Sequence, residues 1–224
     1  MSWISRVTMT AATRQEYRSL RQLKTEPYRQ HQVLWQMFKR PEGTSQPFLF
    51  RQVMGDDDDV LRFLMVSRER PCEAGGLRLE SKSYQPWIEA EARYRFDIRL
   101  NPTRTEKVAG GRGKRQDYVI SRLHQLGVPR HARPAVRRCI VQEELPKWLE
   151  ARGARHGFAL EQCVVACYER LTAHDKGRDM TISVADFVGV LRVTDPDIFG
   201  QVLLSGLGRA KAFGCGLLLL RRMA

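Results

Sequence analysis

Residues 93–100, with the sequence RYRFDIRL, alternate strictly between two kinds of side chain. Tyr94, Phe96, Ile98 and Leu100 are apolar, and the residues between them are three arginines and one aspartate. Successive side chains of a β-strand point to opposite faces of its sheet. The segment therefore predicts a strand with one apolar face and one face that carries positive charge.

The patterns on either side of this strand repeat one order of elements. The first round consists of predicted strands over 2–9, 46–53 and 59–68 and a helix over 25–38. Thr25 is expected to cap that helix. The segment 71–83 has room for a short helix, and 84–90 for a further strand. The second round adds predicted helices over 143–153 and 195–206 and strands over 158–171, 180–193 and 215–221.

The repeated order is strand, helix, strand, strand, helix, strand. It predicts an α+β protein with two tandem ferredoxin-like (RRM-like, βαββαβ) domains, each with an antiparallel sheet. We expect the domains to be residues 1–90 and residues 91–224. The two halves share no sequence repeat, so this prediction depends on the order of elements alone.

One interval of the second round is too long for a simple connection. The 41 residues from Asn101 to Val141 follow the strand at 93–100, and they include a possible short helix over 117–127. Connections of this length are usually functional or disordered. The interval holds ten basic residues and two acidic ones, which accounts for most of the net charge of +13. Such concentrated charge indicates a phosphate-binding surface. The candidate contacts are Arg104, Lys114, Arg115 and Arg138.

The overall charge also narrows the classes of partner. With 38 Lys and Arg against 25 Asp and Glu, the favoured partner is nucleic acid first and an anionic membrane surface second. No apolar run approaches the roughly 18 to 20 residues of a membrane span, and the first residues lack a signal-peptide pattern. We therefore expect a cytoplasmic protein without a membrane partner.

Neither the cysteines nor the acidic residues predict a metal site. The five cysteines are odd in number and include no C-x-x-C pair, so a disulfide framework is not indicated either. Asp56–Asp59 are consecutive, and their carboxylates would point in different directions. A hairpin turn is the preferred interpretation of that run, and no metal or cofactor is expected.

The glycine-rich stretch 205–216, SGLGRAKAFGCG, resembles a phosphate-binding loop near the end of the chain. A dinucleotide-binding loop needs a third glycine where Lys211 stands, and it follows a strand and opens a helix. Here the predicted helix comes first and the strand second, and the P-loop sequence is absent. A nucleotide cofactor is therefore not expected. Gly206 is expected to end the helix, while Arg209 and Lys211 remain as cations for a phosphate backbone.

Tyr28 and His31 share one face of the first predicted helix because they are three residues apart. Leu34, Trp35 and Phe38 continue that face. The histidine is either a partly buried, hydrogen-bonded residue or a proton-transfer group. In a basic protein with a nearby phenol we prefer proton transfer. Cleavage of RNA without metal needs little else, because the substrate's own 2′-OH attacks and the enzyme protonates the departing 5′ oxygen.

Three stretches together resemble one known family: YRQHQVLWQMF, RLNPTRT and GLGRAKAFGCGLLLL. Similar motifs occur in the same order in the CasE endoribonucleases of type I-E CRISPR systems, a branch of the Cas-six superfamily. The resemblance extends over nearly the whole chain and implies two ferredoxin-like domains. It also implies metal-independent cleavage of CRISPR repeat RNA at the base of a stem-loop, which leaves a 5′-hydroxyl and a 2′,3′-cyclic phosphate.

The resemblance further implies roles for individual residues and partners. The family's catalytic histidine and tyrosine fall on His31 and Tyr28, and the lysine of its glycine-rich loop falls on Lys211. The enzyme is expected to stay on the mature crRNA as a subunit of the Cascade complex. Whether His31 acts as an acid or a base stays open. The alternatives are a non-catalytic RNA-binding subunit of a ribonucleoprotein and a small nucleotide-binding enzyme.

Overall fold

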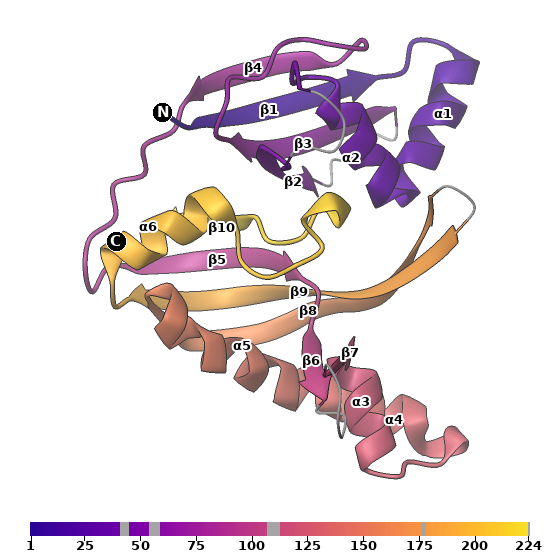
Figure 1. The fold of residues 1–224 in the computed structure, drawn as a ribbon, viewed down its shortest axis with the longest axis vertical. Helices are drawn as coiled ribbons and strands as arrows, with labels where there is room; N and C mark the ends of the chain where they lie inside the picture. Colours follow the sequence, from indigo (N-terminus) through magenta and orange to yellow (C-terminus); the bar gives the residue numbers. More distant parts are fainter. Residues whose placement is uncertain (41–44, 54–58, 107–112, 176–177, 224) are drawn as a thin grey trace. The chain divides into compact units, whose positions relative to one another are not determined.

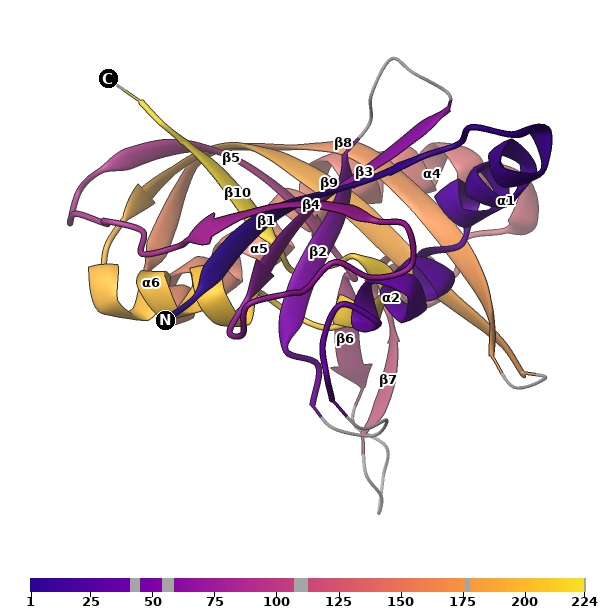
Figure 2. The ribbon, with the colours of Figure 1, turned by 90° about the horizontal axis from the view of Figure 1, so that it is seen from above.

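The computed structural model describes residues 1–40, 45–53, 59–106, 113–175 and 178–223. The chain forms two compact units (Figures 1 and 2). The first comprises Met1–Trp87, Thr172–Met180 and Gly200–Leu218, and the second comprises Ile88–Leu171, Thr181–Phe199 and Leu219–Ala224. In this division the glycine-rich stretch 205–216 groups with the N-terminal residues. The expected domains 1–90 and 91–224 stay a prediction.

An antiparallel sheet with the strand order β2–β3–β1–β4 forms the centre of the first unit. Its strands are β1 (Trp3–Thr10), β2 (Phe48–Val53), β3 (Val60–Ser67) and β4 (Arg78–Ser83). The helices α1 (Arg14–Thr25) and α2 (Pro27–Trp35) lie beside this sheet (Figure 1). Together they bury one apolar core, which includes Val7, Leu20, Leu34, Phe50, Phe63 and Met65.

The helix α1 is not among the predicted elements, and its segment contains few apolar residues. Only Leu20 and Leu23 of its twelve residues are buried. Its start is fixed by a capping box, in which the Thr13 hydroxyl accepts a hydrogen bond from the Glu16 amide (3.2 Å) and Glu16 Oε2 accepts one from the Thr13 amide (3.1 Å). This T-x-x-E pattern is the signal that the sequence offers for α1.

The predicted cap of α2 is wrong. The helix begins at Pro27, whose missing N–H costs nothing in a first turn, and Glu26 precedes it without a side-chain cap. The Thr25 hydroxyl instead donates to the Gln22 carbonyl (2.9 Å). Thr25 therefore belongs to the last turn of α1, and the two helices follow each other with a single residue between them.

Two further segments of the first unit differ from the prediction. The segment 71–83 forms β4 instead of a short helix, and 84–90 forms no strand. Because β4 is an edge strand with mostly exposed side chains, its sequence lacks the apolar alternation of a half-buried strand. The first unit thus has no helix between β3 and β4, although its strand order is that of a ferredoxin-like sheet.

The second unit has the strand order β10–β5–β9–β8, which is equivalent to the order β4–β1–β3–β2 of the first unit. Its main elements are β5 (Arg93–Leu100), α5 (Leu145–Gly153), most of β8 (Phe158–Asp175) and β9 (Arg178–Val193), and β10 (Leu218–Arg222). The helix α6 (Pro196–Ser205) begins in this unit and ends in the first. Tyr94, Phe96, Ile98 and Leu100 are all buried, as the alternation in β5 predicts. The predicted α+β fold with two antiparallel ferredoxin-like sheets is confirmed.

The long basic interval of the second unit contains regular structure. A two-stranded ribbon of β6 (Thr103–Glu106) and β7 (Lys114–Asp117) lies apart from the four-stranded sheet (Figure 2). It is followed by α3 (Tyr118–Gln125), which confirms the predicted helix, and by α4 (Arg133–Cys139). A π-helical turn, Ile140–Glu144, then leads into α5. No described helix has the length and apolar character needed to cross a bilayer.

Candidate active site

The helix α2 is anchored by a buried amide that the sequence analysis did not single out. Gln30 is 2% exposed, and its Nε2 donates to the Leu23 carbonyl (2.9 Å) and to Gln52 Oε1 (2.7 Å). The first bond gives a second donor to a carbonyl at the end of α1 that also accepts from the Glu26 amide (3.2 Å), and the second ties α2 to the edge strand β2. Gln30 therefore fixes the position of the helix that carries Tyr28 and His31.

His31 lies among aromatic rings that come from α2 and β2. Its ring centroid is 6.0 Å from that of Tyr28, 5.5 Å from Trp35, 5.4 Å from Phe48 and 6.3 Å from Phe50. The predicted helical face of Tyr28, His31 and Trp35 is thus present. These contacts hold the imidazole in one place, which a proton-transfer group requires.

The His31 ring nitrogens are covered, and neither makes a hydrogen bond with a described residue. Burial lowers the pKa of His31 because it disfavours the charged ring, and the Gln46 side chain opposes this shift only in part, since it does not reach hydrogen-bond geometry. The neutral imidazole is therefore favoured in the free protein. A substrate atom can reach either nitrogen only after the covering atoms move.

The glycine-rich loop keeps its shape through close contacts with β2 and with itself. Gly206 has φ +76°, the left-handed conformation that commonly ends a helix, and it follows the last residue of α6. Its amide donates to the Val202 carbonyl (2.8 Å). A Cβ at this position would come within 2.7 Å of Leu49 Cδ2. The Leu207 amide donates to the Gly216 carbonyl (2.9 Å) and closes the loop. Gly206 therefore ends the helix, as predicted.

Within this loop, a 3₁₀ turn called η4 (Lys211–Phe213) meets the start of α2. The Phe213 ring lies 5.7 Å from the Tyr28 ring. The Lys211 ammonium donates to the Ser205 carbonyl at the end of α6. Burial lowers the pKa of Lys211, and the charge of Arg68 lowers it further. The structure thus brings the η4 turn together with Tyr28, and through Tyr28 with His31. Arg209, in the same loop, is exposed.

The other predicted RNA-binding residues belong to the second unit. Lys114 and Arg115 are exposed on β7, and Arg138 is exposed on α4. Arg104 on β6 is partly buried, and its Nη1 donates to Gln125 Oε1 (2.8 Å). Of these four, Arg104 therefore has a structural partner as well as a charge to offer.

Some basic side chains of the interval 101–141 have hydrogen-bond partners within the protein, and others are exposed to solvent. Arg122 forms a two-pronged pair with Glu144 (2.7 and 3.1 Å), which joins α3 to the π-helical turn. Arg133 donates to the Val128 carbonyl (3.2 Å). Arg130 and Arg137 are exposed as well, on the same segment as Arg138, so they add to the exposed positive charge of the basic interval.

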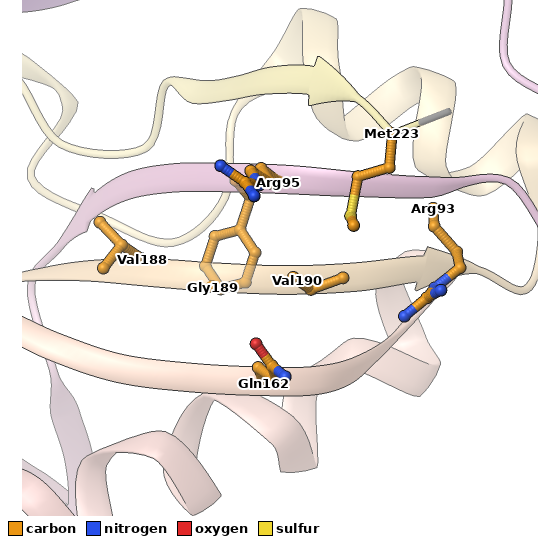
Figure 3. A pocket seen from close by; sticks show the side chains of 8 residues that line it. Arg93, Arg95, Gln162, Val188, Gly189, Val190 and Met223 are labelled. Carbon is orange, nitrogen blue, oxygen red and sulfur yellow. The ribbon is translucent and has the colours of Figure 1, made fainter.

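A shallow depression of about 380 Å³ lies on the sheet of the second unit (Figure 3). Arg93, Arg95 and Gln162 line it together with Val188, Gly189, Val190 and Met223. Arg93 pairs with Glu161 (Nε to Oε2, 2.8 Å), and along the same strand Arg99 pairs with Asp186. Because the depression contains none of the predicted site residues, we do not assign it to the candidate site.

Among the residues that the structure describes, no group of three or more His, Cys, Asp or Glu side chains is arranged to hold a metal ion. The run Asp56–Asp59 falls largely outside the described residues, so its predicted turn has no structural counterpart to compare. The cysteines that are described are all free thiols.

Comparisons with known proteins agree with this architecture. A family model described as CRISPR associated protein matches residues 2–222. The CRISPR system Cascade subunit CasE of Escherichia coli strain K12 is 22% identical over 196 residues, which cover 85% of this chain and 89% of that protein.

Two solved structures are similar over almost the entire chain. Thermus thermophilus Cse3 bound to an RNA that represents a pre-cleavage complex has a TM-score of 0.69 at 22% identity, and the match covers 98% of each chain. The CRISPR-associated protein Cas6e from Escherichia coli K-12 has a TM-score of 0.66 at 22% identity, with 99% of this chain and 100% of that chain covered. At this level of identity, these likenesses show the shared fold.

Proposed function

Because this chain belongs to the CRISPR associated protein family, we propose that it is an endoribonuclease that processes CRISPR precursor RNA within the repeat. The observation that carries the proposal is the cluster of Tyr28, His31 and the η4 turn in the first unit. This cluster brings together an imidazole that can transfer a proton, a phenol, and a loop that contains two cations. The similarity to RNA-bound Cse3 supports the same conclusion.

The proposed reaction is cleavage at the base of the repeat stem-loop. The 2′-OH before the scissile bond attacks the phosphorus, and the bond from phosphorus to the 5′ oxygen breaks. The 2′-OH loses its proton and the 5′ oxygen gains one, which leaves a 2′,3′-cyclic phosphate and a 5′-hydroxyl. Since the nucleophile belongs to the substrate, the protein needs only to align the groups, transfer protons and stabilise charge, and no metal takes part.

We assign proton transfer to His31 and orientation of the 2′-OH or the phosphate to Tyr28. The neutral ring of the free protein can accept a proton. RNA phosphates bound beside it would raise the pKa of His31 and favour the protonated ring. The RNA-bound enzyme would therefore protonate the departing 5′ oxygen.

The cations divide into two groups in this proposal. Lys211 and Arg209 hold phosphates at the cleavage site, and basic residues of the second unit hold the stem. These stem contacts are Arg104, Lys114, Arg115 and Arg138. We further propose that the protein stays bound to the crRNA and assembles with other Cascade subunits; the E. coli relative is, by its name, a Cascade subunit.

Cleavage of the cognate repeat RNA in EDTA tests the mechanism, with His31→Ala as the matched variant. We expect wild-type cleavage to persist in EDTA and the variant to lose it while still binding RNA. Loss of wild-type activity in EDTA, or full activity in His31→Ala, would contradict the proposal.

A second candidate is a non-catalytic RNA-binding subunit. The covered nitrogens of His31 favour it, because the ring cannot exchange a proton with substrate in this arrangement. Tight binding of the repeat RNA without cleavage over hours would support this alternative.

A further inference from the structure

We propose that Arg68 is a phosphate-binding residue of the cleavage site and acts together with Lys211. This inference rests on the proposed function. Arg68 belongs to no recognisable sequence motif. Three features of the first unit support its role: its place at the end of a strand, the ion pair of the neighbouring carboxylate, and its position relative to the glycine-rich loop.

The first feature is the place of Arg68 at the end of β3, directly opposite the start of β2. Its backbone amide donates to the Pro47 carbonyl (3.1 Å), one step beyond the last ladder pair, Ser67 with Phe48. The buried Ser67 fixes the turn by donating through its hydroxyl to the Glu69 carbonyl (2.7 Å). Phe48 is also the ring that stacks on His31 at 5.4 Å. Arg68 is therefore held at the same end of the edge strand as His31.

The second feature is the charge around Arg68. The adjacent carboxylate, Glu69, is occupied by Arg40, whose Nε lies 3.0 Å from Glu69 Oε2 and whose Nη2 binds the other oxygen. Among the described residues, no carboxylate forms an ion pair with Arg68, and its side chain is exposed. An arginine that is placed next to an already neutralised glutamate remains available for an external anion.

The third feature is the loop that covers this end of the sheet. In the β2–β3 ladder Leu49 pairs with Val66, and Arg68 lies two residues beyond Val66, in the bend that follows β3. Leu49 packs directly against Gly206 of the glycine-rich loop. The charge of Arg68 acts on Lys211 in that loop and lowers the pKa of the lysine. Arg68 is bonded to the residue before β2, and the η4 turn that contains Lys211 contacts β2. A phosphate bound between the two cations would relieve their repulsion.

The proposed reaction requires positive charge at the position of Arg68 and Lys211. When the 2′-OH attacks, negative charge grows on the non-bridging oxygens of the phosphate. Fixed cations aimed at these oxygens stabilise the transition state more than the ground state. A guanidinium can contact two oxygens at once, whereas the ammonium of Lys211 acts as a point charge.

The test compares Arg68→Ala and Arg68→Lys with Arg78→Ala. Arg78 is an exposed arginine on β4, the opposite edge strand of the same sheet, so its variant removes one positive charge away from β2. The first measurement is the single-turnover cleavage rate of the cognate repeat RNA with enzyme in excess. We expect Arg68→Ala to lose about tenfold or more in rate, Arg68→Lys to recover part of the loss, and Arg78→Ala to cleave like the wild type.

The second measurement does not need cleavage. Binding of a repeat RNA with a 2′-deoxy nucleotide before the scissile bond is titrated at several salt concentrations. Arg68→Ala should reduce the slope of log K against log salt by about 0.7 to 0.9, which corresponds to one lost phosphate contact. Arg78→Ala should leave the slope unchanged. Because the residue 68 backbone, and not its side chain, binds Pro47, the thermal midpoint should stay at the wild-type value.

The outcomes distinguish a failure of the proposed function from a failure of the inference about Arg68. If the wild type fails to cleave the repeat RNA, the proposed function is wrong, and the salt slope still decides whether Arg68 contacts phosphate. If Arg68→Ala matches Arg78→Ala in both rate and slope, the inference about Arg68 is overturned. A rate loss in Arg68→Ala that comes with a lowered thermal midpoint and an unchanged slope would also overturn it, since the side chain would then be structural.

Discussion

The ring of Phe213 lies 5.7 Å from the ring of Tyr28, and this pair joins two segments from opposite ends of the chain. Tyr28 stands in the first turn of α2, one helical turn before His31, and Phe213 ends the η4 turn that contains Lys211. The contact brings the glycine-rich loop and the helix that carries His31 together, as the proposed cleavage site requires.

Loss of the Phe213 ring should weaken both the site and the fold. Phe213→Ala removes a half-buried ring and its contact with Tyr28, so we expect a decrease of about 1 to 2 kcal/mol in the free energy of unfolding. The loop would then hold Lys211 less firmly against α2, and single-turnover cleavage should slow. Urea unfolding and cleavage kinetics measure the two effects. Wild-type kinetics in a destabilised Phe213→Ala protein would show that the loop does not depend on this contact.

Gly206 should be far more sensitive to substitution than a glycine with the same backbone angle elsewhere. Gly206 and Gly76 have φ of +76° and +74°, so an alanine at either position is strained by about 1 kcal/mol. At Gly206 the new Cβ would also meet Leu49 at 2.7 Å, whereas at Gly76 it would meet no described atom within 4 Å. We expect Gly206→Ala to be clearly less stable than Gly76→Ala in urea unfolding. Equal stabilities would contradict the close packing of the loop on β2.

His31 should make the stability of the protein depend on pH. Burial lowers its pKa in the folded state below the unfolded value of about 6.5. Unfolded chains therefore take up the proton first. The contribution of the neutral ring to stability is present above pH 6.5, and it is lost as the pH falls through the lowered folded pKa.

The measurement is the thermal midpoint at several pH values between 7.5 and 5, for the wild type and for His31→Phe. The wild type should lose more stability over this interval than the variant, which has no titrating ring at this position. Parallel curves for the two proteins would mean that burial does not shift the pKa of His31.

Gln30 is expected to be a positioning residue. Gln30→Ala would leave Gln52 Oε1 without its Gln30 donor and the Leu23 carbonyl with the Glu26 amide as its remaining donor, at a cost of about 1 to 3 kcal/mol. Gln32 lies on the same helix but is exposed, so Gln32→Ala should change stability by no more than about 0.5 kcal/mol. Because Gln30 acts through the position of α2, its variant should slow cleavage at saturating RNA while the dissociation constant stays near the wild-type value. A weakened affinity with an unchanged rate would contradict this role.

The sequence predicts those parts of the fold that have a clear hydrophobic period. β5 alternates strictly, and its four apolar side chains are buried as expected. The helix α1 was missed because only two of its residues are buried, and β4 was missed because an edge strand exposes most of its side chains. Both elements are held by capping or by strand pairing, which a search for apolar periods does not detect.

The residues of the candidate site can likewise be predicted only where they belong to a sequence pattern. Tyr28 and His31 could be grouped from sequence because they share a helix face, and Lys211 from a motif. Arg68 and Gln46 could not, because the proposed place of Arg68 depends on the pairing of β2 with β3, and Gln46 acts on His31 from just before β2. Their neighbours in sequence give no indication of a phosphate or of a histidine nearby.

The central claim is that the substrate's own 2′-OH cleaves the RNA while His31 moves the proton. The most direct measurement replaces the single ribose before the scissile bond by 2′-deoxyribose in the cognate repeat RNA. We predict that this RNA binds with the affinity of the all-ribose RNA and is not cleaved, while the all-ribose RNA gives a product with a 2′,3′-cyclic phosphate. Cleavage of the 2′-deoxy RNA at the same bond would contradict the account.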